Sequence, residues 1–218
     1  MRDPIGRYEF TDEQRKLART LKLGFPAGQN PGEHKALPTY KFTADEYMRL
    51  AEAGVLSRED RVELVDGVIV NMAPTGRPHG RRTHRIARLF GRILPDDIEI
   101  SVQSTIRLNN LNAPEPDIAL LTPEASLDEQ NIPRPEDILL IVEVSDSTLP
   151  RDRREKARRY AESGIPELWI LMVKTEEIEV HRQPTPSGYA NAQRYRRGDT
   201  LTIQALPGIS LAVDDLLQ

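Results

Sequence analysis

Two kinds of hydrophobic pattern divide the chain into expected helices and strands. Apolar residues spaced three or four positions apart predict helices, whereas short continuous or alternating runs of apolar and β-branched residues predict strands. The expected helices are 10–23, 43–54, 78–94 and 152–163. The expected strands are a hairpin within 61–72, then 99–107, 117–121, 138–144, 168–173, 177–182, 189–196 and 200–206. This order of elements predicts a mixed α/β fold with a central sheet.

Glycine and proline separate the first 40 residues from the rest. Residues 24–32 contain three glycines and two prolines, which end the first expected helix. We therefore expect residues 1–40 to form an arm and linker, and residues 41–218 to form one domain. Within that domain, Thr43 is expected to cap the second helix, and Asp66-Gly67 is expected to form the turn of the hairpin.

Composition limits the classes of protein that remain. With 218 residues and 38% hydrophobic content, the chain can bury one sizeable core. No segment approaches the roughly 20 apolar residues of a membrane span, and the start of the chain lacks the apolar core of a secretory signal. Zero cysteines exclude disulfides and thiolate metal sites. We expect a cytoplasmic protein without a membrane partner.

Three carboxylates are candidate functional residues, because each interrupts or borders a run of apolar residues that favours burial. Glu143 follows five consecutive apolar residues near the end of the expected strand 138–144, and a buried acid must be paired, protonated or bound to metal. Asp117 follows Pro116, where the next strand is expected to emerge from a loop. Glu63 precedes the expected hairpin turn. Each also has an ordinary interpretation, respectively a solvated strand end, an Asx-type turn and an exposed sheet face.

Asp117 and Glu143 are our candidate metal ligands. Two acids at adjacent strand ends repel each other unless a divalent cation compensates, and carboxylate oxygens suit Mg²⁺ or Mn²⁺. Lys156 would then stabilise the charge on a phosphorane or position the attacking water. Asp152, Lys156 and Tyr160 follow one another at intervals of four, so Lys156 can face the sheet. The alternative is a surface ion pair between Asp152 and Lys156.

Histidine and arginine supply further candidates. His79 and His84 lie five positions apart, which does not match a zinc-binding pair spaced by four. His79 could contact phosphate or assist proton transfer, or could have no chemical role at the start of its helix.

The net charge of −4 conceals two basic segments, 77–92 and 151–159, which together hold twelve of the 30 basic residues. Local charge is what a polyanion meets. Solvated helix faces balanced by Glu155 and Glu162 are the alternative, but two such helices beside a phosphodiester site favour nucleic acid. The candidate contacts are Arg81, Arg85, Arg154 and Arg158.

The order of these motifs resembles the restriction-endonuclease-like PD-(D/E)XK nuclease superfamily, and within it the Uma-two family of bacterial endonucleases. Residues 62–67 (VELVDG) are similar to the first family motif, 115–117 (EPD) to the second, and 142–148 (VEVSDST) to the third. Asp152, Lys156, Tyr160 and the segment 167–170 then follow in the family's order. The likeness covers about residues 41–185.

This resemblance implies a central mixed sheet flanked by helices, within a nuclease-like domain at 41–218. It implies that Asp117 and Glu143 bind Mg²⁺, with Mn²⁺ as a substitute, and that Glu63 is a supporting acid. The superfamily places a lysine two residues after the second acid, where this chain has Ser145. The resemblance suggests that this lysine has migrated to Lys156 on the next helix.

Three functions follow as hypotheses. The first is a Mg²⁺-dependent DNA endonuclease, and a restriction role would imply a homodimer. The second is a catalytically inactive protein of the same fold, which binds nucleic acid or has a regulatory role. The third is a structural or interaction protein, in which the four polar residues would lie scattered.

Overall fold

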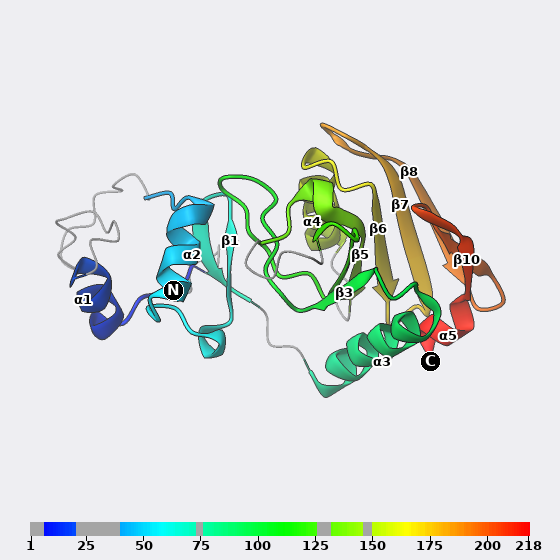
Figure 1. Cartoon of the computed structure of the whole chain (residues 1–218), viewed down its shortest axis with the longest axis horizontal. Coiled ribbons are helices and arrows are strands. Elements are labelled where there is room, and N and C mark those ends of the chain that lie inside the picture. The colour runs from blue at the N-terminus through cyan, green and yellow to red at the C-terminus, as the bar shows by residue number, and fades with distance from the viewer. Residues whose placement is uncertain (1–6, 21–39, 73–75, 126–131, 146–149) are drawn as a thin grey trace. The chain divides into compact units, whose positions relative to one another are not determined.

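The computed structural model describes residues 7–20, 40–72, 76–125, 132–145 and 150–218 (Figure 1). The chain divides into two compact units. The N-terminal unit comprises Met1–Ala73 and Arg107–Pro114, and the C-terminal unit comprises Pro74–Ile106 and Glu115–Gln218.

In the described part of the N-terminal unit, helices and a hairpin pack together. They are α1 (Asp12–Thr20), α2 (Ala44–Glu52), a 3₁₀ turn (Arg58–Asp60), β1 (Val62–Val65) and β2 (Val68–Asn71). Thr43 caps α2 as predicted, because its hydroxyl accepts from the Glu46 backbone N–H while Glu46 accepts from the Thr43 N–H. The hairpin turns at Asp66 (φ 49°) and Gly67 (φ 77°), the two positive φ values of a tight hairpin turn.

The described part of the first 40 residues belongs to this unit. The Tyr8 backbone N–H donates to the Ile69 carbonyl (2.9 Å), and Gln14 Nε2 donates to the Val55 carbonyl (2.9 Å). Ala18 of α1 is fully buried in one core with Tyr47 of α2. The compact units therefore divide the chain at different points from the boundary predicted at residue 40. The remainder of the predicted linker, 21–39, lies outside the described residues.

A six-stranded sheet with the order β3-β4-β5-β6-β7-β8 forms the centre of the C-terminal unit. Only β5 and β6 are parallel, and helix α4 connects them. This confirms the predicted central mixed sheet flanked by helices. The elements are α3 (Arg77–Ile93), β3 (Glu99–Val102), β4 (Ile118–Leu121), a 3₁₀ turn (Pro135–Asp137), β5 (Ile138–Ser145), α4 (Pro150–Glu162), β6 (Glu167–Met172), β7 (Glu177–Thr185) and β8 (Gly188–Arg196).

The C-terminal end differs from the sequence prediction. The segment predicted as strand 200–206 divides into β9 (Thr200–Ile203) and the start of β10 (Leu206–Ala212), which pair in a separate two-stranded sheet. A short helix, α5 (Val213–Leu217), follows. The hydrophobic pattern did not predict β10, in which Pro207-Gly208 falls at a register irregularity between Leu206 and Ser210.

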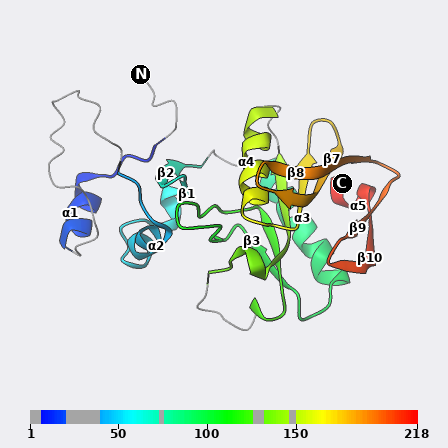
Figure 2. The same cartoon turned by 90° about the horizontal axis from the view of Figure 1, so that it is seen from above.

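The large core orients the helix that begins beside the candidate site. The buried residues of α3 recur at intervals of three or four: they are His79, Thr83, Ile86 and Phe90. Phe90 packs near Trp169 of β6, with ring centroids 6.3 Å apart. One side of α3 thus faces the core, and α3 runs beside β3 (Figure 2). No helix in the described ranges is both long and apolar enough to cross a membrane.

Candidate active site

Asp117 and Glu143 lie opposite each other on neighbouring strands. The antiparallel register pairs Ile118 with Val142, so the next position places Asp117 across from Glu143. Side chains of directly opposed residues share one face of a sheet, with Cβ atoms about 5 Å apart. Both residues are buried, with 7% and 8% of their surface exposed. Glu143 lies two residues before the end of β5 rather than at its end, so the strand carries it further into the fold than predicted.

Donors from three parts of the unit hold the Asp117 carboxylate. His79 Nε2, from the first turn of α3, lies 2.7 Å from Oδ1. The Val144 backbone N–H donates to Oδ2 over 2.8 Å, and Gln103 Nε2 donates to Oδ1 over 3.4 Å. His79 itself is 8% exposed, and its backbone carbonyl accepts from Thr83 Oγ1. The Asp117 side chain is therefore fixed by α3, by β5 and by the residue that follows β3.

Two side chains of α4 occupy the two oxygens of Glu143. Tyr160 donates its hydroxyl proton to Oε1 (2.7 Å), and Lys156 Nζ donates to Oε2 (3.1 Å). Their spacing of four residues places both on one side of the helix, as the sequence pattern predicts. The side chain of Asp152, the third member of that pattern, lies outside the described residues. The ammonium of Lys156 meets Glu143 on the sheet.

The electrostatic surroundings of Glu143 favour compensation by positive charge. Burial is the largest effect and raises the pKa of the Glu143 carboxyl, and the neighbouring Asp117 carboxylate raises this pKa further. The charge of Lys156 and the hydrogen bond from Tyr160 oppose that shift, but the net pKa stays above its ordinary value. An acid pair of this kind suits a cation.

The two carboxylates of the site match the ligands that Mg²⁺ commonly has in proteins. Proteins commonly hold this ion through one or two carboxylates, with water and substrate phosphate completing its coordination. Asp117 and Glu143 supply two carboxylates on one sheet face. Across the described ranges, no group of three or more His, Cys, Asp and Glu side chains forms a metal cluster. An ion here would accordingly depend on these two acids.

Glu63 belongs to the other unit. It lies on β1 opposite Val70 and is half-buried. The C-terminal unit brings together Asp117, Glu143 and Lys156, with His79 and Tyr160 beside them. The supporting role of Glu63 stays a prediction.

The candidate arginines have different surroundings. Arg81 and Arg85 are exposed on α3, where Arg85 donates to Gln218 Oε1 (3.2 Å). On α4, Arg154 is exposed, and Arg158 forms an ion pair with Glu162 (2.7 Å). The balanced-face alternative therefore applies to Arg158.

Sequence reasoning did not select Gln103 or the Val144 backbone N–H. Gln103 follows the last residue of β3 and has a φ of 45°, and its backbone N–H donates to the Asp117 carbonyl (3.1 Å). A glutamine after an alternating strand gives no signal of that turn. A backbone donor such as Val144 becomes visible only once the strand register is known.

Comparison with known proteins identifies a family and solved structures of similar fold. The model of the Uma2 family, described as "Putative restriction endonuclease", matches residues 44–214. The chain is similar to the crystal structure of "a putative nuclease belonging to DUF820" from Anabaena variabilis, with a TM-score of 0.64 and 13% identity over 81% of this chain and 97% of that chain. At this identity the likeness shows the fold. No curated protein matches the sequence.

Proposed function

Since the chain belongs to the Uma2 family, which is the family its motifs resemble, we propose that it is a metal-dependent endonuclease that hydrolyses phosphodiester bonds of DNA. The family and the fold support a nuclease. The observation that carries the finer proposal is the pairing of two buried acids, Asp117 and Glu143, with Lys156 in contact with the second.

In this proposal, Asp117 and Glu143 hold Mg²⁺, with Mn²⁺ as a substitute. When bound there, the ion would polarise the phosphodiester and lower the pKa of a coordinated water. The two carboxylates must keep fixed orientations for that purpose. His79 and Tyr160 each place a polar group 2.7 Å from one carboxylate, which suits them to position the acids.

Lys156 has the exposure that a catalytic ammonium needs. Its side chain is 44% exposed, whereas the side chain of its partner Glu143 is 11% exposed. The ammonium therefore lies at the boundary between a buried acid and solvent, where a phosphate oxygen can approach. From there it can donate to the developing negative charge of the transition state or orient the attacking water. This geometry supports the proposal that Lys156 takes the role of the superfamily lysine, because Lys156 reaches Glu143 from the next helix.

Supercoiled-plasmid nicking in Mg²⁺ tests the proposal. We expect Asp117→Ala and Lys156→Ala each to reduce the cleavage rate by about 100-fold or more, the scale seen when a transition-state donor is removed. Lys174→Ala, at an exposed lysine of the same unit, is the matched control and should cleave like wild type. Equal residual cleavage by all four proteins would indicate a contaminating nuclease and refute the proposal.

A nucleic-acid-binding or regulatory protein without turnover is the second candidate. It is favoured by Ser145, which occupies the position where the superfamily has its lysine. Calorimetric titration with Mn²⁺ separates the two candidates. The endonuclease should bind the ion at millimolar concentration or below, and Asp117→Ala should abolish that binding. An absence of any divalent-ion binding would favour the second candidate.

A further inference from the structure

An open groove of about 620 Å³ lies between α3 and the edge strand β3 of the C-terminal unit. Arg81, His84 and Arg88 lie along its helical side, at intervals of three and four residues. Ala87, Ile100 and Val102 contribute an apolar, half-buried lining. We call this feature the α3–β3 groove.

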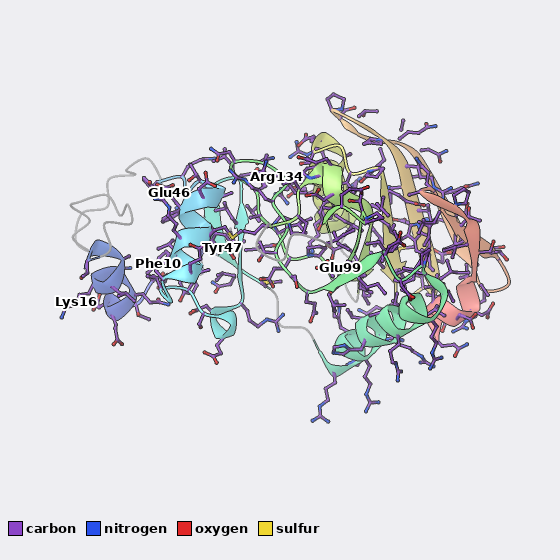
Figure 3. All side chains as sticks on the ribbon, in the orientation of Figure 1. Phe10, Lys16, Glu46, Tyr47, Glu99 and Arg134 are labelled. Carbon is purple, nitrogen blue, oxygen red and sulfur yellow. The ribbon has the colours of Figure 1, made fainter. Side chains whose placement is uncertain are left out.

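The helical side of the groove is rich in arginine. Helix α3 contains six arginines and no acidic residue. None of these arginines forms an ion pair within the part of the chain that the structure describes. The exposed arginines of β8 differ, since Arg194 pairs with Glu179 (2.9 Å) and Arg196 with Glu177 (2.7 Å). In Figure 3, long side chains that end in nitrogen extend from the outer side of α3.

The two segments that line the groove also carry residues of the candidate active site. On α3, Arg81 is two residues from His79, which contacts Asp117. On β3, Val102 precedes Gln103, whose side-chain amide and backbone N–H both donate to Asp117. From His79 to Arg88 the helix rises about 14 Å. Ile100 and Val102 pair with Leu120 and Ile118, which share a core with Phe90 of α3. Asp117 and Glu143 alternate to the other face of the sheet. A ligand that occupied both the groove and the acid pair would therefore pass from one face of the sheet to the other.

We propose that the α3–β3 groove binds a single strand of nucleic acid that continues to the candidate active site, so that the substrate is DNA with an unpaired strand at this position. This inference rests on the proposed function. Arg81 and Arg88 would contact phosphates, while Ala87, Ile100 and Val102 would pack against sugars and base faces. The positive charge of the arginines favours a polyanion as the ligand. The apolar lining favours a polyanion with exposed bases, which is a single strand of nucleic acid.

Duplex DNA and an acidic peptide fit less well. The groove volume falls within the range of about 300–1,000 Å³ that is typical of small-molecule pockets, which is too small for a duplex to enter. A duplex resting on the arginines would leave Ile100 and Val102 without a contact. A peptide could pair with the free edge of β3, but its backbone would then be neutral beside Arg81 and Arg88.

Fluorescence anisotropy in EDTA tests the proposal without requiring turnover. The probe is a labelled oligonucleotide of about 12 nucleotides, within the size range of single-strand binding sites, alone or annealed to its complement. The variant is Arg81→Gln with Arg88→Gln, which keeps helix propensity. The matched control, Arg194→Gln with Arg196→Gln, removes the same charge from exposed positions on β8.

We expect the α3 variant to bind the single strand about 10- to 30-fold more weakly at 0.1 M salt, with a salt slope reduced by about 1.4 because two phosphate contacts are lost. Duplex binding and the β8 control should change little. An equal loss for duplex, an equal loss in the control, or no loss would each overturn the proposal. Binding of polyglutamate of the same charge as tightly as the oligonucleotide would also overturn it.

The nicking assay and this binding assay fail independently. A protein that does not cleave plasmid but loses single-strand binding in the α3 variant would refute the proposed hydrolysis and retain the groove. In the opposite case, cleavage depends on Lys156, but the wild type and the α3 variant bind the single strand equally well. That result would retain the proposed hydrolysis and refute the groove proposal.

Discussion

Glu143 is a buried carboxyl whose pKa is higher in the folded protein than its ordinary value of 4.5. Between these two values the folded state binds more protons than the unfolded state, so the free energy of unfolding falls as the pH rises. The stabilisation is thus complete below about pH 4.5 and is lost as the pH rises through the raised pKa of Glu143. Glu143→Gln removes this dependence.

We therefore expect the wild type to lose stability relative to Glu143→Gln as the pH rises from about 4.5 towards neutrality. Urea unfolding in EDTA across this range measures the difference. Glu52→Gln, at an exposed position of α2, is the control and should follow the wild type. Parallel curves for wild type and Glu143→Gln would contradict the expectation.

At the scale of single residues, sequence reasoning selected acids but not the groups that hold them. Asp117 and Glu143 could be selected because each interrupts or borders an apolar run. The contact between His79 and Asp117 could not be predicted, because it depends on where the first turn of α3 meets the sheet. The local pattern around His79 is compatible with an inert helix start as well as with the buried contact observed.

Secondary structure followed the hydrophobic pattern where that pattern is long. The helices predicted at 78–94 and 152–163 are α3 and α4, each shifted by no more than two residues. Strand β3 ends at Val102, five residues earlier than predicted, because Gln103 adopts a positive φ. Side-chain alternation continues past such a turn, so the sequence pattern alone cannot locate it.

The β1–β2 hairpin depends on Gly67. A Cβ at this position would lie 2.9 Å from Lys41 Cβ and 3.2 Å from Leu111 Cδ2, and the residue has a φ of 77°. We expect Gly67→Ala to cost about 1–2 kcal/mol for backbone strain and a further 1–3 kcal/mol for crowding. Urea unfolding followed by far-UV circular dichroism measures this loss.

Gly54 supplies the matched control for this hairpin variant. It has a φ of 69°, but a Cβ there would meet no atom within 4 Å. Gly54→Ala should consequently show the strain cost of about 1–2 kcal/mol without the crowding cost. Equal losses in the two variants would show that the contact with Lys41 has no energetic weight.

At the scale of the whole molecule, each chain supplies one pair of opposed acids, Asp117 and Glu143. Cleavage of both strands at one place needs two such sites, which is the reason to expect a homodimer if the protein acts as a restriction enzyme. Sedimentation velocity with duplex DNA should then give a complex whose protein mass, after the DNA mass is subtracted, is twice that of one chain. A monomer that converts supercoiled plasmid only to the nicked form would contradict this expectation.

Helix α3 links two properties that mutations could change, the range of bound ligands and the rate of cleavage. Its 17 residues form one rod of about 25 Å that begins at the His79 contact with Asp117 and continues along the α3–β3 groove. Because a rod moves as a whole, a substitution that tilts it to accommodate a different ligand also displaces His79. Mutations that broaden the range of bound ligands should therefore alter cleavage rate at the same time, unless they change side chains on the outer surface and leave the axis in place.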